Sequence, residues 1–211
     1  MDFLDRSEEL NRPLGKVVKS NSHCDYVVQL DDALDVQSPP EPESYGFGQF
    51  VKLEKDGRHW AVGIIYNSQL FNPMFLNNGP RLSSEPDPLF TPDLINETRT
   101  LLGTVLVGTL AFKDHQTFGL QGIPKAVVPV NTPVYAMSPQ EIYRFHLNQD
   151  QHPQICYYAH LLRCGGTFAA QLTQQVLSEL ISSNLFSGPD QRALDVLCKE
   201  LSWKNTMGAM R

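Results

Sequence analysis

Residues 14–66 contain four short runs of apolar and polar side chains, separated by turn residues. Alternation at every second position, with β-branched and aromatic residues, is typical of strands that bury one face. We predict strands over residues 15–20, 25–30, 49–54 and 59–66, and an exposed acidic, proline-rich loop over 31–45. These four strands are predicted to form the first half of a small β-barrel.

Two features shape the second hairpin of this half-barrel. Asp56 and Gly57 form an Asp-Gly pair, which supplies the positive φ angles that a two-residue hairpin turn requires. Gly63 lies in the middle of the fourth strand and indicates a bend or bulge that curls the sheet. We expect the fourth strand to place four large side chains on one face: Trp60, Val62, Ile64 and Tyr66.

Residues 67–101 interrupt the strand pattern. Residues 67–91 read as a long irregular loop, because prolines recur from Pro73 onward. Thr91 as N-cap, followed by Pro92, predicts a short helix that ends near residues 101–103. The loop also carries five large apolar side chains, which are Leu70, Phe71, Met74, Phe75 and Leu76. They are expected to pack on the barrel or on a partner.

The second half of the predicted barrel follows this insertion. Residues 104–112 are apolar on both faces, which indicates a central or covered strand. Residues 113–124 read as a loop, 125–130 as a further strand and 133–136 as a last short strand. The barrel therefore occupies residues 14–137, after a flexible lead-in over residues 1–13.

The pattern changes to helical periodicity at Ser138, where Ser138, Pro139 and Glu141 form a capping box with proline at the first helical position. Further helices are predicted over residues 154–163, 167–184 and 190–203. The third helix has its apolar side chains four residues apart, at Phe168, Leu172, Val176 and Leu180. The predicted fold is α+β: a small closed or partly open β-barrel of about six strands, then a helical region over 138–211 with three to four helices.

Composition favours a packed protein of ordinary solubility. The chain has 211 residues, of which 41% are hydrophobic and 19% charged, with a net charge of -6. This charge argues against strong binding to nucleic-acid phosphates. The N-terminus lacks the apolar core of a secretory signal, and the apolar run 101–112 is too short to span a bilayer. The four cysteines do not form a disulfide framework, so we expect a cytoplasmic protein with free thiols.

The barrel portion resembles the HAS-barrel, found at the N-terminus of HerA-type DNA-translocating ATPases and of F-type ATP synthase ring subunits. The resemblance rests on the segments 15–20, 26–30, 48–51, 60–65, 102–108 and 134–139. In that family the barrel precedes a P-loop ATPase, but no P-loop motif occurs here, and the glycine cluster Gly165-Gly166 lacks the required lysine. The resemblance implies a barrel without the ATPase domain, and hence a protein that acts in assembly or as an adaptor.

Four residues at four-residue spacing are candidate metal ligands: His152, Cys156, His160 and Cys164. A His-x3-Cys pair on a helix can bind zinc. The set spans about 18 Å of helix, so one ion cannot contact all four, and a complete site would need His146 or Cys198. The alternative is an amphipathic helix with cysteine as a small apolar residue. We predict no metal, cofactor or catalytic residue. Cys24 beside His23 and Cys164 near His160 are conceivable nucleophile–base pairs.

Two functions in binding macromolecules remain, and a metal-binding protein that uses the C-terminal His and Cys residues is a second alternative. The first is a non-enzymatic role in protein–protein assembly, with a protein partner or a second copy bound through Phe71, Met74, Phe75 and Leu76. The alternative is a nucleic-acid-binding barrel associated with DNA processing. That alternative would use a basic face with aromatic neighbours, made of Lys16, Lys19, Lys52, Lys55 and Arg58 beside Tyr45, Phe47 and Trp60.

Overall fold

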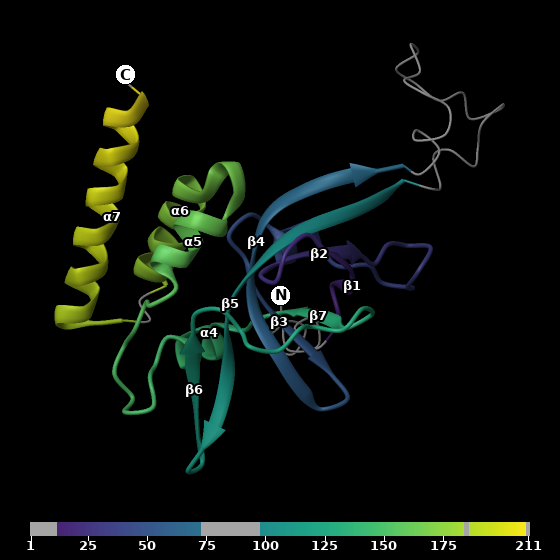
Figure 1. Cartoon of the computed structure of the whole chain (residues 1–211), viewed down its shortest axis with the longest axis horizontal. Helices are drawn as coiled ribbons and strands as arrows, with labels where there is room; N and C mark the ends of the chain where they lie inside the picture. The colour runs from purple at the N-terminus through teal and green to yellow at the C-terminus, as the bar shows by residue number, and fades with distance from the viewer. Residues whose placement is uncertain (1–11, 73–97, 184–185, 210–211) are drawn as a thin grey trace.

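The computed structural model describes residues 12–72, 98–183 and 186–209, with side chains described as far as residue 203. Within these residues the chain forms a closed β-barrel of six antiparallel strands, one further strand beside it, and four α-helices (Figure 1). The predicted α+β class and the order of barrel before helices are therefore confirmed. Among the described residues, no helix is long and apolar enough to cross a membrane.

The strands follow the order β2-β1-β7-β3-β4-β5-β6, and a further pairing of β2 with β5 closes the barrel. β6 pairs with β5 outside the closed ring. A short 3-10 helix, η1 (Pro42–Tyr45), lies in the loop between β2 and β3. The strands are β1 (Gly15–Ser20), β2 (Asp25–Leu30), β3 (Phe50–Lys55), β4 (Arg58–Phe71), β5 (Arg99–Lys113), β6 (Gln116–Gln121) and β7 (Pro133–Ala136).

The inside of the barrel is filled by apolar side chains rather than by a channel. Each strand of the ring contributes buried residues, including Val17, Tyr26, Val28, Leu53, Ala61, Ile65, Leu102, Leu106 and Val134. Val128, from the segment between β6 and β7, joins this core, and its backbone N–H donates to the Tyr26 hydroxyl at 3.1 Å. Because burial of one such apolar side chain contributes about 1.5–3 kcal/mol, this interior is a main source of stability.

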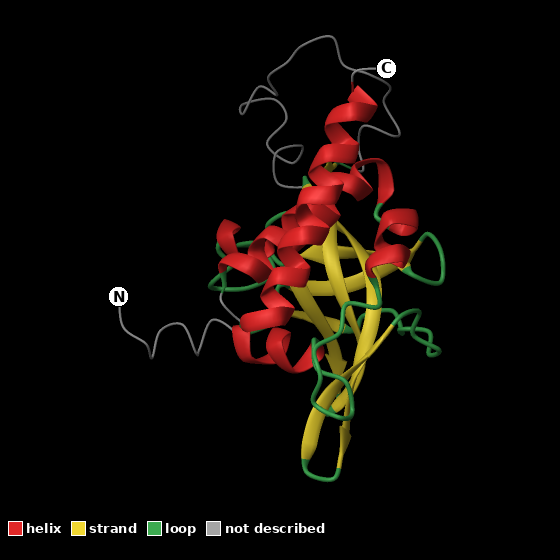
Figure 2. Cartoon of the chain, turned by 90° about the vertical axis from the view of Figure 1, so that its left-hand side faces the viewer, coloured by secondary structure: helices red, strands yellow, loops and turns green. Residues whose placement is uncertain are grey.

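A second core lies between the outer wall of the barrel and the helices. Phe50, Val62, Ile64, Val105 and Val107 face outward and pack against the helical region. Figure 2 views the helices from the side on which they cover the strands. They are α4 (Pro139–Phe145), α5 (Tyr158–Cys164), α6 (Ala169–Ser182) and α7 (Gly188–Ala209), with the 3-10 turn η2 (Gly166–Phe168) before α6.

Several local predictions are confirmed. β1 and β2 have the predicted bounds, and β3 lies one residue later than predicted. Asp56 and Gly57 adopt φ angles of 54° and 73°, as a two-residue hairpin turn requires. The capping box at α4 is complete, since the Ser138 hydroxyl accepts from the Glu141 N–H and the Glu141 carboxylate accepts from the Ser138 N–H.

The predicted insertion at residues 67–101 is largely wrong where the structure describes it. β4 continues through Phe71 and β5 begins at Arg99, so both ends of the insertion are strand. Residues 101–103 are therefore not the end of a helix; the predicted helix start at Thr91 lies outside the described residues. The polar run at 67–69 reads as a loop, but its backbone is paired with residues 101–103 of β5.

β6 was not predicted, and the strand predicted over 125–130 is irregular in the structure. Residues 113–124, predicted as loop, contain a hairpin whose turn residues Asp114 and His115 have φ angles of 51° and 62°. Its second strand, β6, has a single β-branched residue, Thr117, to mark it. Conversely, Pro124 and Pro129 bracket the segment 125–128 and each lacks an N–H for a ladder.

The side chain of Trp60 faces differently from the prediction. The β3–β4 ladder passes from the Leu53–Ala61 pair to the Glu54–His59 pair, so Trp60 is an extra residue in a β-bulge. Trp60 therefore packs beside the barrel interior, whereas Val62, Ile64 and Tyr66 face the helices. The irregularity expected at Gly63 is present in the β4–β5 ladder.

In the third predicted helix, Phe168 is 56% exposed because it lies in η2, while Leu172, Val176 and Leu180 are buried as expected. The preceding helix is shorter than predicted: α5 begins at Tyr158, so residues 154–157 are not part of it.

Candidate functional site

The outer parts of β4 and β5 form a two-stranded ribbon, here called the β4–β5 ribbon and comprising residues 67–71 and 99–103. Its register places Leu70 opposite Thr100 and Phe71 opposite Arg99. β2 pairs with β5 only from Leu101 onward, so these last two pairs lie beyond the closed ring. Figure 1 shows the ribbon projecting from the barrel. The structure thus presents this end of the two strands outside the barrel wall.

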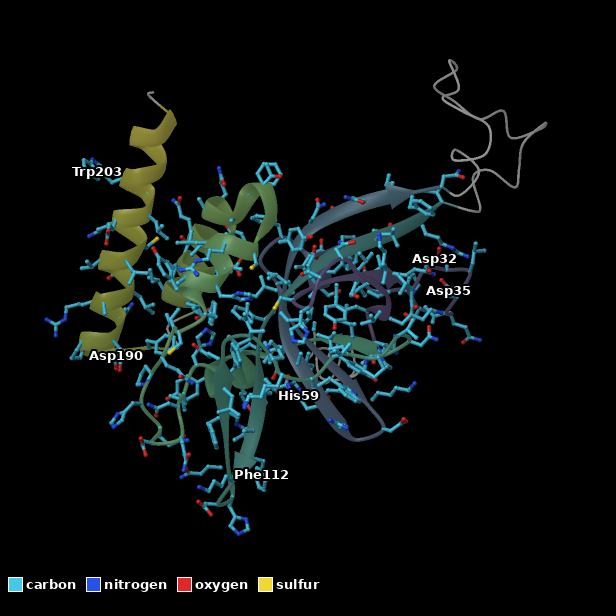
Figure 3. The ribbon with its side chains drawn as sticks, in the orientation of Figure 1. Asp32, Asp35, His59, Phe112, Asp190 and Trp203 are labelled. Carbon is cyan, nitrogen blue, oxygen red and sulfur yellow. The ribbon has the colours of Figure 1, made fainter. Side chains whose placement is uncertain are left out.

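An ion-pair cluster holds the outer end of the ribbon, because Arg99 is opposite Phe71. The Arg99 guanidinium donates to the Asp32 carboxylate and lies 3.5 Å from the Asp35 carboxylate, both in the loop after β2 (Figure 3). Partial burial opposes ionisation of Asp32, but the hydrogen bonds from Arg99 and from the backbone of Leu34 and Asp35, together with the Arg99 charge, lower the pKa of Asp32 below its usual value. Asn72 Nδ2 also donates to Thr98 Oγ1 at 3.3 Å, across the two strands.

Apolar side chains occupy the end of this anchored ribbon. Leu70 is 79% exposed and Phe71 is 38% exposed. Of the predicted partner-binding residues, Phe71 is placed here, while Met74, Phe75 and Leu76 lie outside the described residues. Leu70 belongs to the site as well, although it was not among the predicted binding residues, because the paired strand carries it to the same end as Phe71.

The candidate metal ligands do not converge. No group of three or more His, Cys, Asp or Glu side chains within the described residues could hold a metal ion. Cys156 precedes α5, and its backbone N–H donates to Gln121 Oε1 at 2.6 Å. His160 points at the barrel wall, where its Nε2 donates to the Leu106 carbonyl oxygen at 3.0 Å. Thus His160 joins α5 to β5.

In the two candidate nucleophile–base pairs, His23 with Cys24 and His160 with Cys164, the Nε2 atom of the histidine is hydrogen-bonded to a backbone carbonyl oxygen and not to the thiol. His23 Nε2 lies 2.7 Å from the Pro124 carbonyl oxygen, and a carbonyl oxygen can only accept. The Nε2 atoms of His23 and His160 are therefore both donors and cannot act as bases there. Cys24 is buried, and burial, followed by the nearby Cys164, raises the pKa of its thiol. A raised pKa disfavours the reactive thiolate.

A histidine–tyrosine pair is enclosed in the core of the described part of the molecule. His146 has 0% exposure, and its Nε2 lies 2.8 Å from the Tyr157 hydroxyl. Desolvation lowers the pKa of His146 to about 4. Neither group is accessible to a substrate, so we assign the pair to structure. The sequence pattern indicates His146 only as an additional metal ligand. Its partner Tyr157 is eleven residues away, and no periodicity of the sequence links the two residues.

The predicted basic face is partly neutralised. Lys52 Nζ donates to Glu141 Oε1 at 2.5 Å and lies 3.6 Å from Glu54 Oε2. The Arg58 guanidinium stacks over the Trp60 ring, 3.9 Å from its centre. Lys19 and Lys55 remain exposed. The charge of Lys52 is thus balanced by carboxylates of this chain, whereas Arg58 is held in place but keeps its charge. The loss of one cation of the five reduces the charge that the face offers to a polyanion.

Comparison with known proteins assigns the chain to a family but indicates no activity. No curated protein sequence matches the chain. One family model, described as Domain of unknown function (DUF8166), matches residues 5–211. The match includes the barrel, the β4–β5 ribbon and all four helices of the described part. The chain therefore belongs to the family described as Domain of unknown function (DUF8166).

Proposed function

We propose that this chain is a non-enzymatic protein that assembles with other proteins, and that the end of the β4–β5 ribbon is its docking surface. The observation that carries this proposal is the exposure of Leu70 and Phe71 at the end of a ribbon that Arg99 ties to Asp32 in the loop after β2. As neighbours in one strand, Leu70 and Phe71 point to opposite faces of the ribbon, so a partner that contacts both would enclose the ribbon end. Large exposed apolar side chains mark interaction sites.

The backbone of the ribbon supports the same function. Within the described residues, β3 pairs with β4 only as far as Ile64, so no strand covers the outer edge of β4 at residues 67–71. An uncovered strand edge is a template for pairing with another chain. Because the ribbon is held by Arg99 and Asp32, binding there costs less conformational entropy than binding through a free loop.

The resemblance to the HAS-barrel implies an equivalent role, since that barrel holds subunits together and docks partners. The partner is another protein or a second copy of this chain, and both would contact the same surface. We further propose that the protein works in the cytoplasm, because its four cysteines are unpaired.

The test is a double variant, Leu70→Asp with Phe71→Asp, compared with the wild type and with Val196→Asp. Val196 is 66% exposed on α7, far along the chain from the ribbon, and controls for the loss of an exposed apolar side chain. Exposed substitutions of this kind change stability by about 0.5 kcal/mol or less, so all three proteins should unfold similarly. Analytical ultracentrifugation measures self-association, and quantitative co-purification measures binding of partners.

We expect the double variant to weaken self-association or the capture of a defined partner by about tenfold or more, since loss of two apolar anchors removes a typical hot spot. The Val196→Asp protein should behave as the wild type. If the wild type remains monomeric and captures the same proteins as the double variant, the proposal is wrong. Salt-sensitive binding of single-stranded DNA by the wild type would favour the nucleic-acid alternative instead.

A further inference from the structure

A groove lies between α4 and the hairpin formed by β5 and β6; we call it the α4–β6 groove. It has a volume of about 680 Å³. Its lining includes Phe112, His115 and Thr117 from the hairpin, and Tyr143 and Arg144 from α4. Figure 3 shows Phe112 near the outer end of the hairpin, away from the β4–β5 ribbon. The groove is therefore a separate surface from the proposed docking site.

The charge of the groove is positive, although the whole chain is acidic. None of its ten lining residues is an Asp or Glu, whereas Arg144 and His115 are present. Glu141, one turn before Arg144 on α4, is already held by Lys52 and by the Ser138 cap. Arg144 makes no ion pair with any described residue. An acidic group entering the groove would thus meet an arginine without a carboxylate partner in the described part of the chain.

The wall of the groove contains the edge of β6 at Thr117, which no other strand of the described residues covers. Gly119 of β6 directs its backbone away from β5, because its N–H donates to the Leu147 carbonyl oxygen at 2.9 Å and its carbonyl accepts from Gln154 Nε2 at 2.7 Å. Outward and inward backbone groups alternate along an antiparallel strand. Thr117, two residues earlier, therefore also directs its N–H and C=O outward, and it lines the groove.

Two aromatic rings complete the surface. Phe112 is 71% exposed and Tyr143 is 40% exposed, and both line the groove. Aromatic side chains of this kind bury large apolar area at low entropic cost when a partner binds. The groove thus combines a backbone edge, one available guanidinium and apolar walls.

We propose that the α4–β6 groove binds an extended acidic peptide segment of a partner protein. The main chain of the peptide pairs with the N–H and C=O of Thr117. One of its carboxylates pairs with Arg144, and a neighbouring apolar side chain packs against Phe112 and Tyr143. A peptide fits better than a nucleic acid, because one arginine gives little phosphate attraction while an exposed strand edge complements a polypeptide backbone.

The experiment is a selection of random linear peptides against the full chain, followed by affinity measurement with the most enriched peptide by fluorescence anisotropy. We expect enriched sequences to combine Asp or Glu with an apolar residue. Arg144→Glu should weaken the selected peptide by about tenfold or more, and a new selection on this variant should enrich Lys or Arg. Lys125→Glu makes the same charge change on an exposed loop outside the groove, and should leave binding unchanged.

A second variant tests the strand pairing. Thr117→Pro removes an N–H that points away from β5, and proline is tolerated at such edge positions, so the protein should still fold, as circular dichroism can check. We expect it to bind the peptide about tenfold or more weakly.

Four outcomes would overturn the proposal: no enrichment, enrichment without acidic residues, an affinity unaffected by Arg144→Glu, or an affinity unaffected by Thr117→Pro in the folded protein. Displacement of the peptide by single-stranded DNA would assign the groove to nucleic acid and would overturn it as well.

Discussion

The His146 imidazole and the Tyr157 hydroxyl form a hydrogen bond of 2.8 Å with both side chains buried. His146 Nδ1 lies 2.7 Å from the Ile142 carbonyl oxygen, so Nδ1 carries the proton and Nε2 accepts from Tyr157. The rings of Phe50, Phe145 and Phe186 surround this pair, at centroid distances of 5.4–5.9 Å from His146. The pair therefore joins β3, α4 and the segment before α7 in one packed cluster.

Removal of the tyrosine hydroxyl should destabilise the protein. Tyr157→Phe keeps the ring but leaves His146 Nε2 buried without a donor, which costs about 1–3 kcal/mol. Urea unfolding measures the loss. Tyr158→Phe, at the next residue and only partly buried, serves as the control and should cost less. Equal losses in the two variants would show that the hydrogen bond contributes nothing.

The same histidine predicts a dependence of stability on pH. Its pKa is about 4 in the folded protein, because burial disfavours the charged form, and about 6.5 in the unfolded chain. The unfolded chain therefore gains a proton first as the pH falls. The contribution is fully present above pH 6.5 and decreases by about 3 kcal/mol between pH 6.5 and pH 4.

His146→Gln provides the comparison, because an amide can donate to Ile142 and accept from Tyr157 but does not titrate. Whatever its absolute stability, this variant should lose about 3 kcal/mol less than the wild type between pH 7 and pH 4 in urea titrations. Parallel pH profiles for the two proteins would contradict the assignment of this titration to His146.

Glu141 has two roles that substitutions can separate. Partial burial opposes its ionisation, but hydrogen bonds from Lys52 and Ser138 lower its pKa below the usual value. Glu141→Gln keeps an oxygen for the cap and loses the ion pair, at a cost of about 0.5 kcal/mol. Glu141→Ala loses both, at about 1–2 kcal/mol. Thermal unfolding tests this order, with the exposed Glu43→Gln as a neutral control; a reversed order would contradict it.

Gly119 is required by the close approach of α4 to β6. A Cβ atom at this position would lie 1.9 Å from the Phe145 carbonyl oxygen, which is backbone and cannot easily move. We expect Gly119→Ala to cost about 3 kcal/mol in urea unfolding, as overpacking of a tight site does. Gly46→Ala is the matched control, since nothing lies within 4 Å of its Cβ position. Similar stability of the two variants would disprove the steric constraint.

The parts of the fold that were predictable from the sequence are those fixed by neighbours in the chain. The valines of β1 and β2, the Asp56-Gly57 turn and the Ser138 capping box all depend on residues within one hairpin or one helical turn. Such local signals specify structure directly. They were sufficient to predict a barrel followed by helices.

The errors occurred where long-range packing decides. β6 has weak local signals and exists because it pairs with β5 and contacts α4 through Gly119. Residues 125–130 have a strand-like composition, but only Val128 is drawn into the barrel core. The Trp60 bulge depends on the register of β3, which the sequence of β4 alone does not specify.

The candidate sites also differ in whether local sequence signals or long-range packing determine them. Phe71 was predicted as a binding residue from its apolar character, although the strand that carries it was predicted as a loop. The α4–β6 groove was not predicted, because it combines Phe112, Thr117 and Arg144 from elements that meet only after folding.

β5 is a single unbroken strand of fifteen residues with Arg99 at one end and Lys113 at the other. At about 3.3 Å per residue its extended length is about 45 Å, and its ends are closer than this because the strand bends along its course (Figure 1). The ribbon end and the groove are thus attached to opposite ends of one continuous, hydrogen-bonded strand. If both surfaces are occupied, β5 sets the distance between the two partners. A change in the length of β5 would then change that distance.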